Sequence, residues 1–240
     1  LLKAGLPKNA AALILGKGED IGSKIFSNNN LQNVVFTGSL ETAKIIQKQL
    51  HERSDLINLI AETGGLNCLI ADSSALTEHV VEDVINSAFN SAGQRCSACR
   101  ILCVEENVYK KTLTMLRGAA DSLIVSSPEL ISTDVGPVID SFAKEKIQNH
   151  INNFTKKYQS KEIYNEGNFI NPIIIEIKNI NEVREEIFGP VLHILSFNSK
   201  NLLALCNQIN SLNYGLTLGI HIRIDRVIET VINNTNVGNT

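Results

Sequence analysis

The hydrophobic positions of the chain alternate between short apolar runs and longer stretches with a helical repeat. Residues 34–36 are β-branched and aromatic, and residues 40–53 then carry an apolar face with the spacing of an amphipathic helix. A second pair follows, with a short run at 67–71 and a helical stripe over 76–92 that is expected to end at Gly93. This alternation predicts an α/β fold with largely parallel sheets.

The same patterns predict the remaining elements and one boundary. Segment 62–65 ends an apolar strand in two glycines, which can act as a hinge, so we expect domains at residues 1–63 and 64–240. Strands are predicted at 11–15, 56–60, 100–104, 173–177, 191–197 and 216–222, and helices at 108–123, 142–158, 202–212 and 226–233.

Composition narrows the classes of protein and partner. The chain has 240 residues, 43% hydrophobic and 20% charged, which is enough apolar material for a sizeable core. A net charge of −3 gives no electrostatic reason to expect nucleic acid or an anionic membrane as partner. No apolar run approaches the roughly 20 residues of a membrane span, and no signal peptide is evident, so we expect a cytoplasmic protein. The chain lacks an initiator Met and is expected to be part of a longer protein.

The strongest chemical motif surrounds Cys96. Five cysteines without a secretory signal predict reduced thiols, one of which is free to act as a nucleophile. In residues 91–98, a helix is expected to end at Gly93, and Cys96 follows in a polar turn beside Arg95. A buried structural cysteine remains the commoner interpretation of a lone Cys. Cys96 and Cys99 form half of a zinc motif, but no second pair completes it, so no metal is expected.

Three weaker motifs accompany the cysteine. Glu62 lies at the end of a predicted strand, and a carboxylate there, close to a thiol, can activate water. The alternative interpretation is an exposed glutamate at a turn. Glycines at 16, 18 and 22, with the segment 36–39 before a helix, suit a phosphate, or form an ordinary loop. Residues 185–190 have the sequence Glu-Glu-Ile-Phe-Gly-Pro, in which the acidic and aromatic side chains could hold a ribose and a flat ring. The alternative interpretation is an acidic helix end followed by a turn.

Taken in this order, the motifs resemble the aldehyde dehydrogenase superfamily over essentially the whole chain. The similar order is a glycine loop, F-T-G-S, E-x-G-G, G-Q-x-C and E-E-I-F-G-P, and the spacing between Glu62 and Cys96 also matches the family. The closer resemblance is to the 1-pyrroline-5-carboxylate dehydrogenase domain of bacterial proline utilisation A proteins. It runs through residues 61–67, 87–98, 135–140, 214–219 and 221–225.

The resemblance implies a mechanism and a set of site residues. Cys96 would attack an aldehyde, expected to be L-glutamate semialdehyde, hydride would pass to NAD, and water activated by Glu62 would hydrolyse the thioester. Ser97 would contact the substrate carboxylate. The cofactor residues implied are Gly18, Gly22, Gly38, Ser39, Gly64, Glu186 (nicotinamide ribose) and Phe188 (nicotinamide).

The resemblance also implies a domain organisation. Residues 1–63 would be the C-terminal part of a Rossmann-like NAD-binding domain, and 64–240 a catalytic domain lacking its C-terminal end. The partners expected are the small aldehyde, copies of the same full-length protein, and missing segments of that protein. Alone, the chain is expected to be inactive. The alternatives are a non-catalytic remnant or interaction module of the same fold, an esterase-like thiol activity, or another aldehyde substrate.

Overall fold

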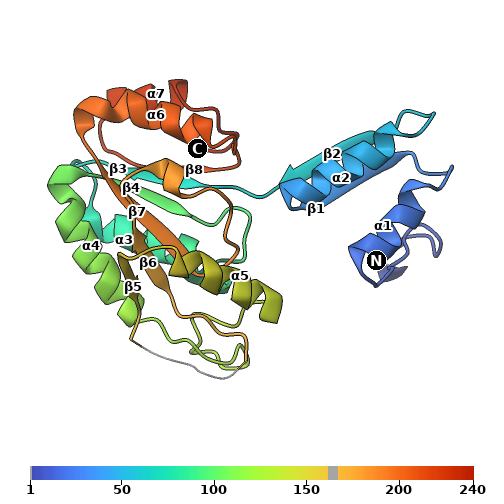
Figure 1. Ribbon diagram of the computed structural model, residues 1–240, viewed down its shortest axis with the longest axis horizontal. Coiled ribbons are helices and arrows are strands. Elements are labelled where there is room, and N and C mark those ends of the chain that lie inside the picture. Colours follow the sequence, from blue (N-terminus) through green and yellow to red (C-terminus); the bar gives the residue numbers. More distant parts are fainter. Residues whose placement is uncertain (1, 162–166) are drawn as a thin grey trace. The chain divides into compact units, whose positions relative to one another are not determined.

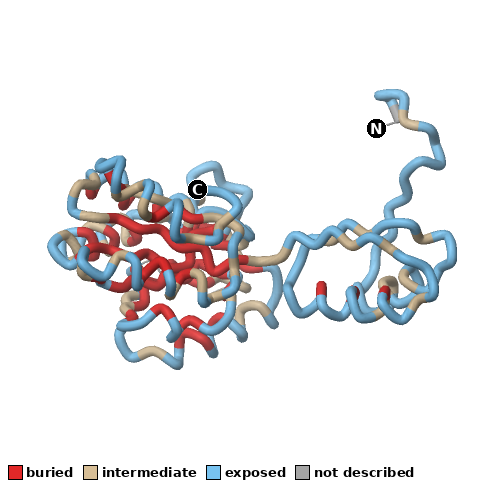
Figure 2. The backbone as a smooth tube through the Cα atoms, turned by 90° about the horizontal axis from the view of Figure 1, so that it is seen from above, coloured by how far each residue is buried: buried red, intermediate tan, exposed pale blue. Residues whose placement is uncertain are grey.

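The computed structural model describes residues 2–161 and 167–240 and divides into two compact units. The first unit is Leu1–Thr63 and the second is Gly64–Thr240, so the division falls within the glycine-bearing segment 62–65. Buried backbone, red in Figure 2, is concentrated in the second unit, where it follows the strands of a large sheet.

The first unit contains a parallel βαβ arrangement preceded by a helix. β1 (Asn33–Gly38) pairs in parallel with β2 (Asn58–Thr63), and α2 (Leu40–His51) connects them. Helix α2 forms as predicted because its apolar residues recur on one face, and Ala43, Ile46 and Leu50 are buried there. The preceding helix is α1 (Gly18–Phe26), and a short 3₁₀ turn covers Leu2–Ala4.

Two expectations for the start of the chain are wrong. Residues 11–15 form no strand, and Gly18 and Gly22 of the glycine motif lie on helix α1 instead of in a loop. A strand needs a neighbour for its backbone groups, and within the described residues 11–15 pair with none, leaving Leu13 85% and Leu15 83% exposed. Glu19 and Asp20 in the first turn favour α1 through the helix dipole, which offsets the helix-weakening glycines.

The second unit is built on a six-stranded sheet that confirms the predicted α/β fold. The order is β5-β6-β7-β4-β3-β8, and every pairing is parallel except β5 with β6. Strands β3 and β4 are buried along their whole length, as expected when helices cover both faces of a parallel sheet. The strands are β3 (Cys68–Ala71), β4 (Ile101–Glu105), β5 (Lys157–Gln159), β6 (Ile173–Glu176), β7 (Val191–Phe197) and β8 (Leu218–His221).

Helices cover both faces of this sheet. The chain moves from β3 to β4 in one direction and from β7 to β8 in the other, so right-handed crossovers place α3 and α6 on opposite faces. Figure 1 shows α6 and α7 side by side, away from α3 and α4. The helices are α3 (Thr77–Phe89), α4 (Glu106–Asp121), α5 (Ser141–Asn152), α6 (Leu202–Ser211) and α7 (Asp225–Asn233), with 3₁₀ turns at Asn90–Gly93, Ile180–Glu182 and Ser199–Asn201. None of the helices in the described residues combines the length and apolar character that crossing a membrane requires.

Two helices, α3 and α5, end well before the residues that their periodicity predicts. Helix α3 ends at Phe89, because Ser91 and Ala92 adopt left-handed backbone angles (φ 56° and 53°) that no α-helix continues through. Helix α5 ends at Asn152, and Tyr158 lies instead on β5. There the Tyr158 hydroxyl donates a 2.6 Å hydrogen bond to Asp121, so partners distant in sequence override the local helical pattern.

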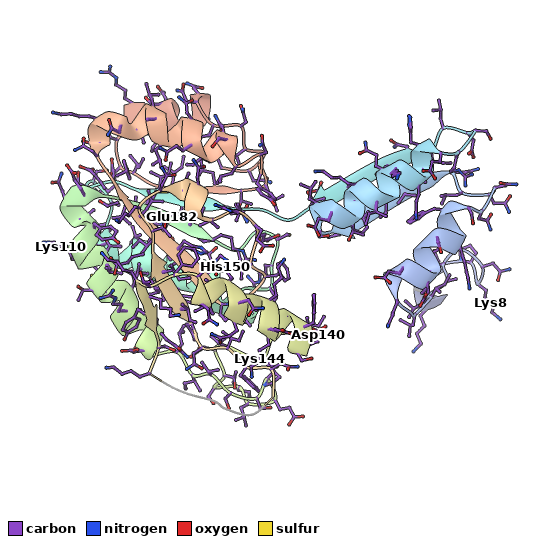
Figure 3. All side chains as sticks on the ribbon, viewed as in Figure 1. Lys8, Lys110, Asp140, Lys144, His150 and Glu182 are labelled. Carbon is purple, nitrogen blue, oxygen red and sulfur yellow. The ribbon has the colours of Figure 1, made fainter. Side chains whose placement is uncertain are left out.

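A pair of buried histidines joins α5 to the sheet. The Nε2 atoms of His150 and His193 are 2.9 Å apart, and His193 Nδ1 lies 3.0 Å from the Arg100 carbonyl oxygen. Since a carbonyl only accepts, His193 carries a proton on Nδ1, and a neutral His193 then accepts from His150 through Nε2. His150 follows Asp140 and Lys144 along the helix in Figure 3. Burial lowers the pKa of His193 to about 3, and the neighbouring His150 adds to the effect.

Stability is therefore expected to fall as the pH drops below the ordinary histidine range. In the unfolded chain His193 takes up a proton near pH 6.5, whereas in the folded chain it stays neutral down to about pH 3. Protonation of His193 therefore favours the unfolded chain. The free energy of unfolding should fall by roughly 2 kcal/mol between pH 7 and pH 5 because of this residue. Urea unfolding of His193→Gln at both pH values should show a pH dependence smaller by about that amount. The exposed His79→Gln is the control, and equal pH slopes for His193→Gln and the wild type would contradict the assignment.

Candidate active site

The residues that precede four parallel strands meet at one edge of the large sheet. Asn67 comes directly before β3 and Arg100 directly before β4, while Pro190 and Thr217 directly precede β7 and β8. Because these strands are parallel neighbours in the order β7-β4-β3-β8, their starting points lie side by side. The Arg100 N–H donates to the Asn67 carbonyl at 2.9 Å, which ties two of the four starts together. This site therefore forms at the amino-terminal edge of the sheet, opposite to the edge where α/β sheets usually bind ligands.

Asn67 holds the turn that carries Cys96. Its Nδ2 donates to the carbonyl oxygens of Cys96 at 2.6 Å and Ala98 at 3.0 Å, and its Oδ1 accepts from the Thr217 N–H at 3.1 Å. The Asn67 residue is only 5% exposed, so these bonds are shielded from water. The thiol of Cys96 is free and belongs to an exposed residue, whereas Cys99 is buried.

The chain before Cys96 is held by close backbone contacts. Gly93 has φ +65°, and a Cβ placed there would come within 2.1 Å of the Gly189 carbonyl oxygen. Ser91 and Ala92 are left-handed too, and such a run of strained residues persists only when its surroundings fix it. Part of that support is the Gln94 side chain, which donates to Pro137 and accepts from Ile139. The turn is therefore anchored on both sides of the cysteine.

Arg100 supplies the buried guanidinium at this edge of the sheet. The sequence analysis did not single out this residue. Arg95, the residue expected to stand beside the thiol, is exposed and donates to the Ser91 hydroxyl at 3.2 Å. Arg100 is 1% exposed and donates from Nη2 to the Arg95 carbonyl at 3.1 Å and to Glu186 Oε1 at 3.3 Å. Burial lowers the Arg100 pKa, and Glu186 opposes that shift most strongly. The signal in the sequence was an arginine directly before the apolar run of residues 101–104.

Glu186 lies in a cradle that glycine makes possible. A Cβ on Gly64 would come within 1.7 Å of Glu186 Oε2, so any other residue at 64 would displace the carboxylate. Burial raises the pKa of Glu186, while Arg100 and the Gly65 N–H oppose that rise. The Phe188 ring is 44% exposed, with the Arg100 guanidinium 5.4 Å from its centroid. Gly64, Glu186 and Phe188 thus gather around Arg100.

Ser97 opens onto a small pocket beside the Cys96 turn. The pocket has a volume of about 280 Å³, and Ser97 shares its lining with Asn67, Ser87 and Thr217. These side chains present hydroxyl and amide groups, which suit a polar small molecule. Within the described residues no group of three or more His, Cys, Asp or Glu side chains is arranged to hold a metal ion.

The remaining candidate residues belong to the first unit. Gly38 ends β1, and Ser39 caps α2, its hydroxyl accepting from the Thr42 N–H at 3.1 Å. A pocket of about 450 Å³ between α1 and α2 is lined by Gly18, Gly22 and several apolar side chains, among them Ile21, Phe26, Phe36 and Ile46. Gly18 and Gly22 therefore line this pocket from a helix. Glu62 is exposed on β2, where it pairs with Thr37.

Comparison with known proteins places the chain in a family. The family model for the aldehyde dehydrogenase family matches residues 1–240. The chain is 46% identical, over its whole length, to the bifunctional protein PutA of Klebsiella aerogenes, of which it spans 19%. A crystal structure of a Bradyrhizobium japonicum proline utilization A mutant matches 99% of the chain and 25% of its own, at 42% identity and a TM-score of 0.95.

A second solved structure extends the comparison to a separate dehydrogenase. The 1-pyrroline-5-carboxylate dehydrogenase from Thermus, crystallised with bound NAD, matches 99% of the chain and 47% of its own length. The identity is 28% and the TM-score is 0.89, so the fold is shared even where the sequences have diverged. With a family model covering every residue and the same fold in these structures, the chain belongs to the aldehyde dehydrogenase family.

Proposed function

We propose that this chain supplies the reacting residues of an NAD-dependent oxidation of L-glutamate semialdehyde to glutamate. The observation that carries the proposal is the exposed Cys96, held on a fixed turn beside the Arg100–Glu186–Phe188 cluster, in a chain 46% identical to PutA. The first unit, residues 1–63, is then part of the NAD-binding domain. The second unit, residues 64–240, is the thiol-bearing catalytic domain.

Cys96 acts as the nucleophile. Its thiolate attacks the aldehyde carbon, the carbonyl π electrons move to oxygen, and the Cys96 backbone N–H stabilises the resulting oxyanion. Asn67 supports this geometry because it holds the carbonyls of Cys96 and Ala98 and so fixes the plane of the turn. Oxidation leaves a thioester on Cys96.

The residues of both units suit the cofactor. The apolar pocket between α1 and α2 fits a flat adenine ring, and Gly38 and Ser39 lie at the N-terminus of α2, which favours a pyrophosphate. The Glu186 carboxylate accepts hydrogen bonds from a ribose, and the exposed Phe188 ring offers a face to the nicotinamide. Bound NAD supplies the acceptor for the hydride that leaves the aldehyde carbon.

Glu62 and Ser97 complete the reaction. Glu62 removes a proton from the water that attacks the thioester, and its exposure on β2 leaves the carboxylate accessible to that water. Ser97 donates to the carboxylate of the substrate from the pocket of about 280 Å³ that it lines. The similarity to PutA and to the Thermus 1-pyrroline-5-carboxylate dehydrogenase supports this substrate, which is the open-chain form of 1-pyrroline-5-carboxylate.

Cys96 should be the first of the five thiols to react with an alkylating agent. Cys68, Cys99, Cys103 and Cys206 are buried, and burial raises the pKa of Cys99 to about 12, which keeps it protonated and unreactive. Peptide mass spectrometry after brief exposure to limiting iodoacetamide should find most of the label on Cys96. Cys96→Ala should abolish the early labelling, with Cys206→Ala as the control. Label appearing first on any buried cysteine would argue against the nucleophile assignment.

Replacement of Glu62 by Gln should separate the two halves of the reaction. Acylation of Cys96 by an activated ester needs no general base for water, so the initial burst should persist. Hydrolysis of the acyl-enzyme should slow by roughly 100-fold or more, the usual contribution of a positioned base. Stopped-flow release of p-nitrophenol measures both phases. The exposed Glu82→Gln on α3 should change neither phase, and equal loss of burst and steady state in Glu62→Gln would indicate a structural role instead.

The 240-residue polypeptide alone should bind NAD weakly and form little NADH. Its first-unit sheet has two strands, with Val35 75% and Ile60 52% exposed, whereas the Thermus relative that it matches over 47% of its length was crystallised with NAD. Fusion to the aldehyde dehydrogenase segment that precedes the matching region in PutA should restore NADH formation from L-glutamate semialdehyde. Calorimetry and absorbance at 340 nm measure binding and turnover. Rapid turnover by the polypeptide alone would contradict this prediction, and a fusion that binds NAD without turnover would favour a non-catalytic module.

A further inference from the structure

Arg100 is the most completely buried charged side chain of the second unit. It is 1% exposed, although a guanidinium taken out of water is costly unless other groups replace its hydration. Its Nε–H is buried and has no hydrogen-bond partner among the described residues. The Nε–H of Arg117 is likewise buried without a partner among the described residues, so this feature alone does not distinguish Arg100. The partners of its Nη1 and Nη2 groups show which segments Arg100 joins.

The bonded end of Arg100 joins two segments that the mechanism uses. Nη2 donates both to the Arg95 carbonyl, next to Cys96, at 3.1 Å and to the Glu186 carboxylate at 3.3 Å. Nη1 donates to the Gly189 carbonyl at 3.3 Å. One planar group thereby connects the nucleophile turn with both sides of Phe188.

The face of the same guanidinium orients the Phe188 ring. The Arg100 Cζ atom lies 5.4 Å from the ring centroid, within the range of a cation–π contact. Arginine suits such a place because its fork donates in one plane while its face stacks on an aromatic ring. A lysine ammonium keeps the charge but has neither the planar fork nor the stacking face.

Arg100 also sets the electrostatics around the site. Burial raises the pKa of Glu186, and the adjacent Arg100 cation is the first of the groups that oppose the rise. An ionised Glu186 accepts hydrogen bonds from ribose hydroxyls, whereas a protonated one presents a donor in their place. The negative charge of a Cys96 thiolate would also raise the pKa of Arg100 against burial, after the larger effects of Glu186 and Cys99.

We propose that Arg100 is a positioning residue of the dehydrogenase, which fixes the Cys96 turn relative to the ribose-binding carboxylate of Glu186 and the ring of Phe188. This inference rests on the proposed function. It assigns Arg100 no contact with substrate or cofactor, because its bonded donors end on protein groups. The planar fork acts on geometry, and the charge acts on Cys96 and Glu186.

The test compares Arg100→Met and Arg100→Lys with a matched control. Arg117→Met is suitable because Arg117 also pairs with a carboxylate, Glu176 at 2.9 Å, and stacks on a ring, Tyr158 at 5.2 Å, away from Cys96. The first readout is the rate of Cys96 alkylation in the 240-residue chain without cofactor. The second is the KM for NAD against kcat in the fused dehydrogenase described above.

Arg100→Met should slow alkylation and raise the KM for NAD, each by roughly 10- to 100-fold, the range for losing one charged hydrogen-bond partner. Arg100→Lys should recover the alkylation rate while the KM stays raised, because charge returns without the planar fork. That split is not expected of partial unfolding, so Arg100→Lys decides the test if Arg100→Met fails to fold. Values equal to those of Arg117→Met would overturn the inference, and so would full recovery of both readouts by lysine.

Glu186→Gln separates failure of this inference from failure of the proposed function. If Glu186 holds the ribose, Glu186→Gln should raise the KM for NAD. An unchanged KM in Glu186→Gln would remove the proposed role of Glu186. A raised KM in Glu186→Gln together with an unchanged KM in both Arg100 variants would remove only the positioning role of Arg100.

Discussion

The parallel pairing of β7, β4, β3 and β8 is the constraint on which the rest of the second unit depends. Parallel strands all begin at the same edge, so the segments entering them must meet there, however far apart they lie in the sequence. Asn67, Arg100 and Thr217 come from three such segments and hydrogen-bond to one another or to the Cys96 turn between them. The pairing of the strands thus fixes the positions of the residues around the Cys96 thiol.

Burial decides which polar groups at this edge can act. Cys96 is exposed while Cys68, Cys99, Cys103 and Cys206 are buried, so a single cysteine is left accessible for nucleophilic chemistry. Glu186 and Arg100 lie on the buried side of this edge, where each partly offsets the cost of burying the charge of the other. The glycines serve the same packing: Gly64 leaves room for the Glu186 carboxylate, and Gly93 lets the turn approach Gly189.

The first unit has fewer elements, and its candidate residues Ser39 and Glu62 lie at the carboxyl ends of its two parallel strands. Its β1–α2–β2 arrangement places Ser39 at a helix N-terminus and Glu62 near the end of a strand, the positions where α/β proteins gather ligand-binding groups. Its core is small, however, with Ala43, Ile46 and Leu50 as the buried residues of α2. The binding properties of the first unit should therefore depend more on additional structure than those of the second unit.

The sequence by itself determined the fold class and the position of the main elements, and it carried the motifs at Glu62, Cys96 and Glu186, because apolar periodicity and motif order are local properties of a chain. It failed at residues 11–15, at the glycines of α1 and at the ends of α3 and α5, where strand partners, left-handed turns and distant hydrogen bonds decide the outcome. Only the tertiary structure singled out Asn67 and Arg100. Their significance lies in partners up to 150 positions away, and no local pattern carries that information.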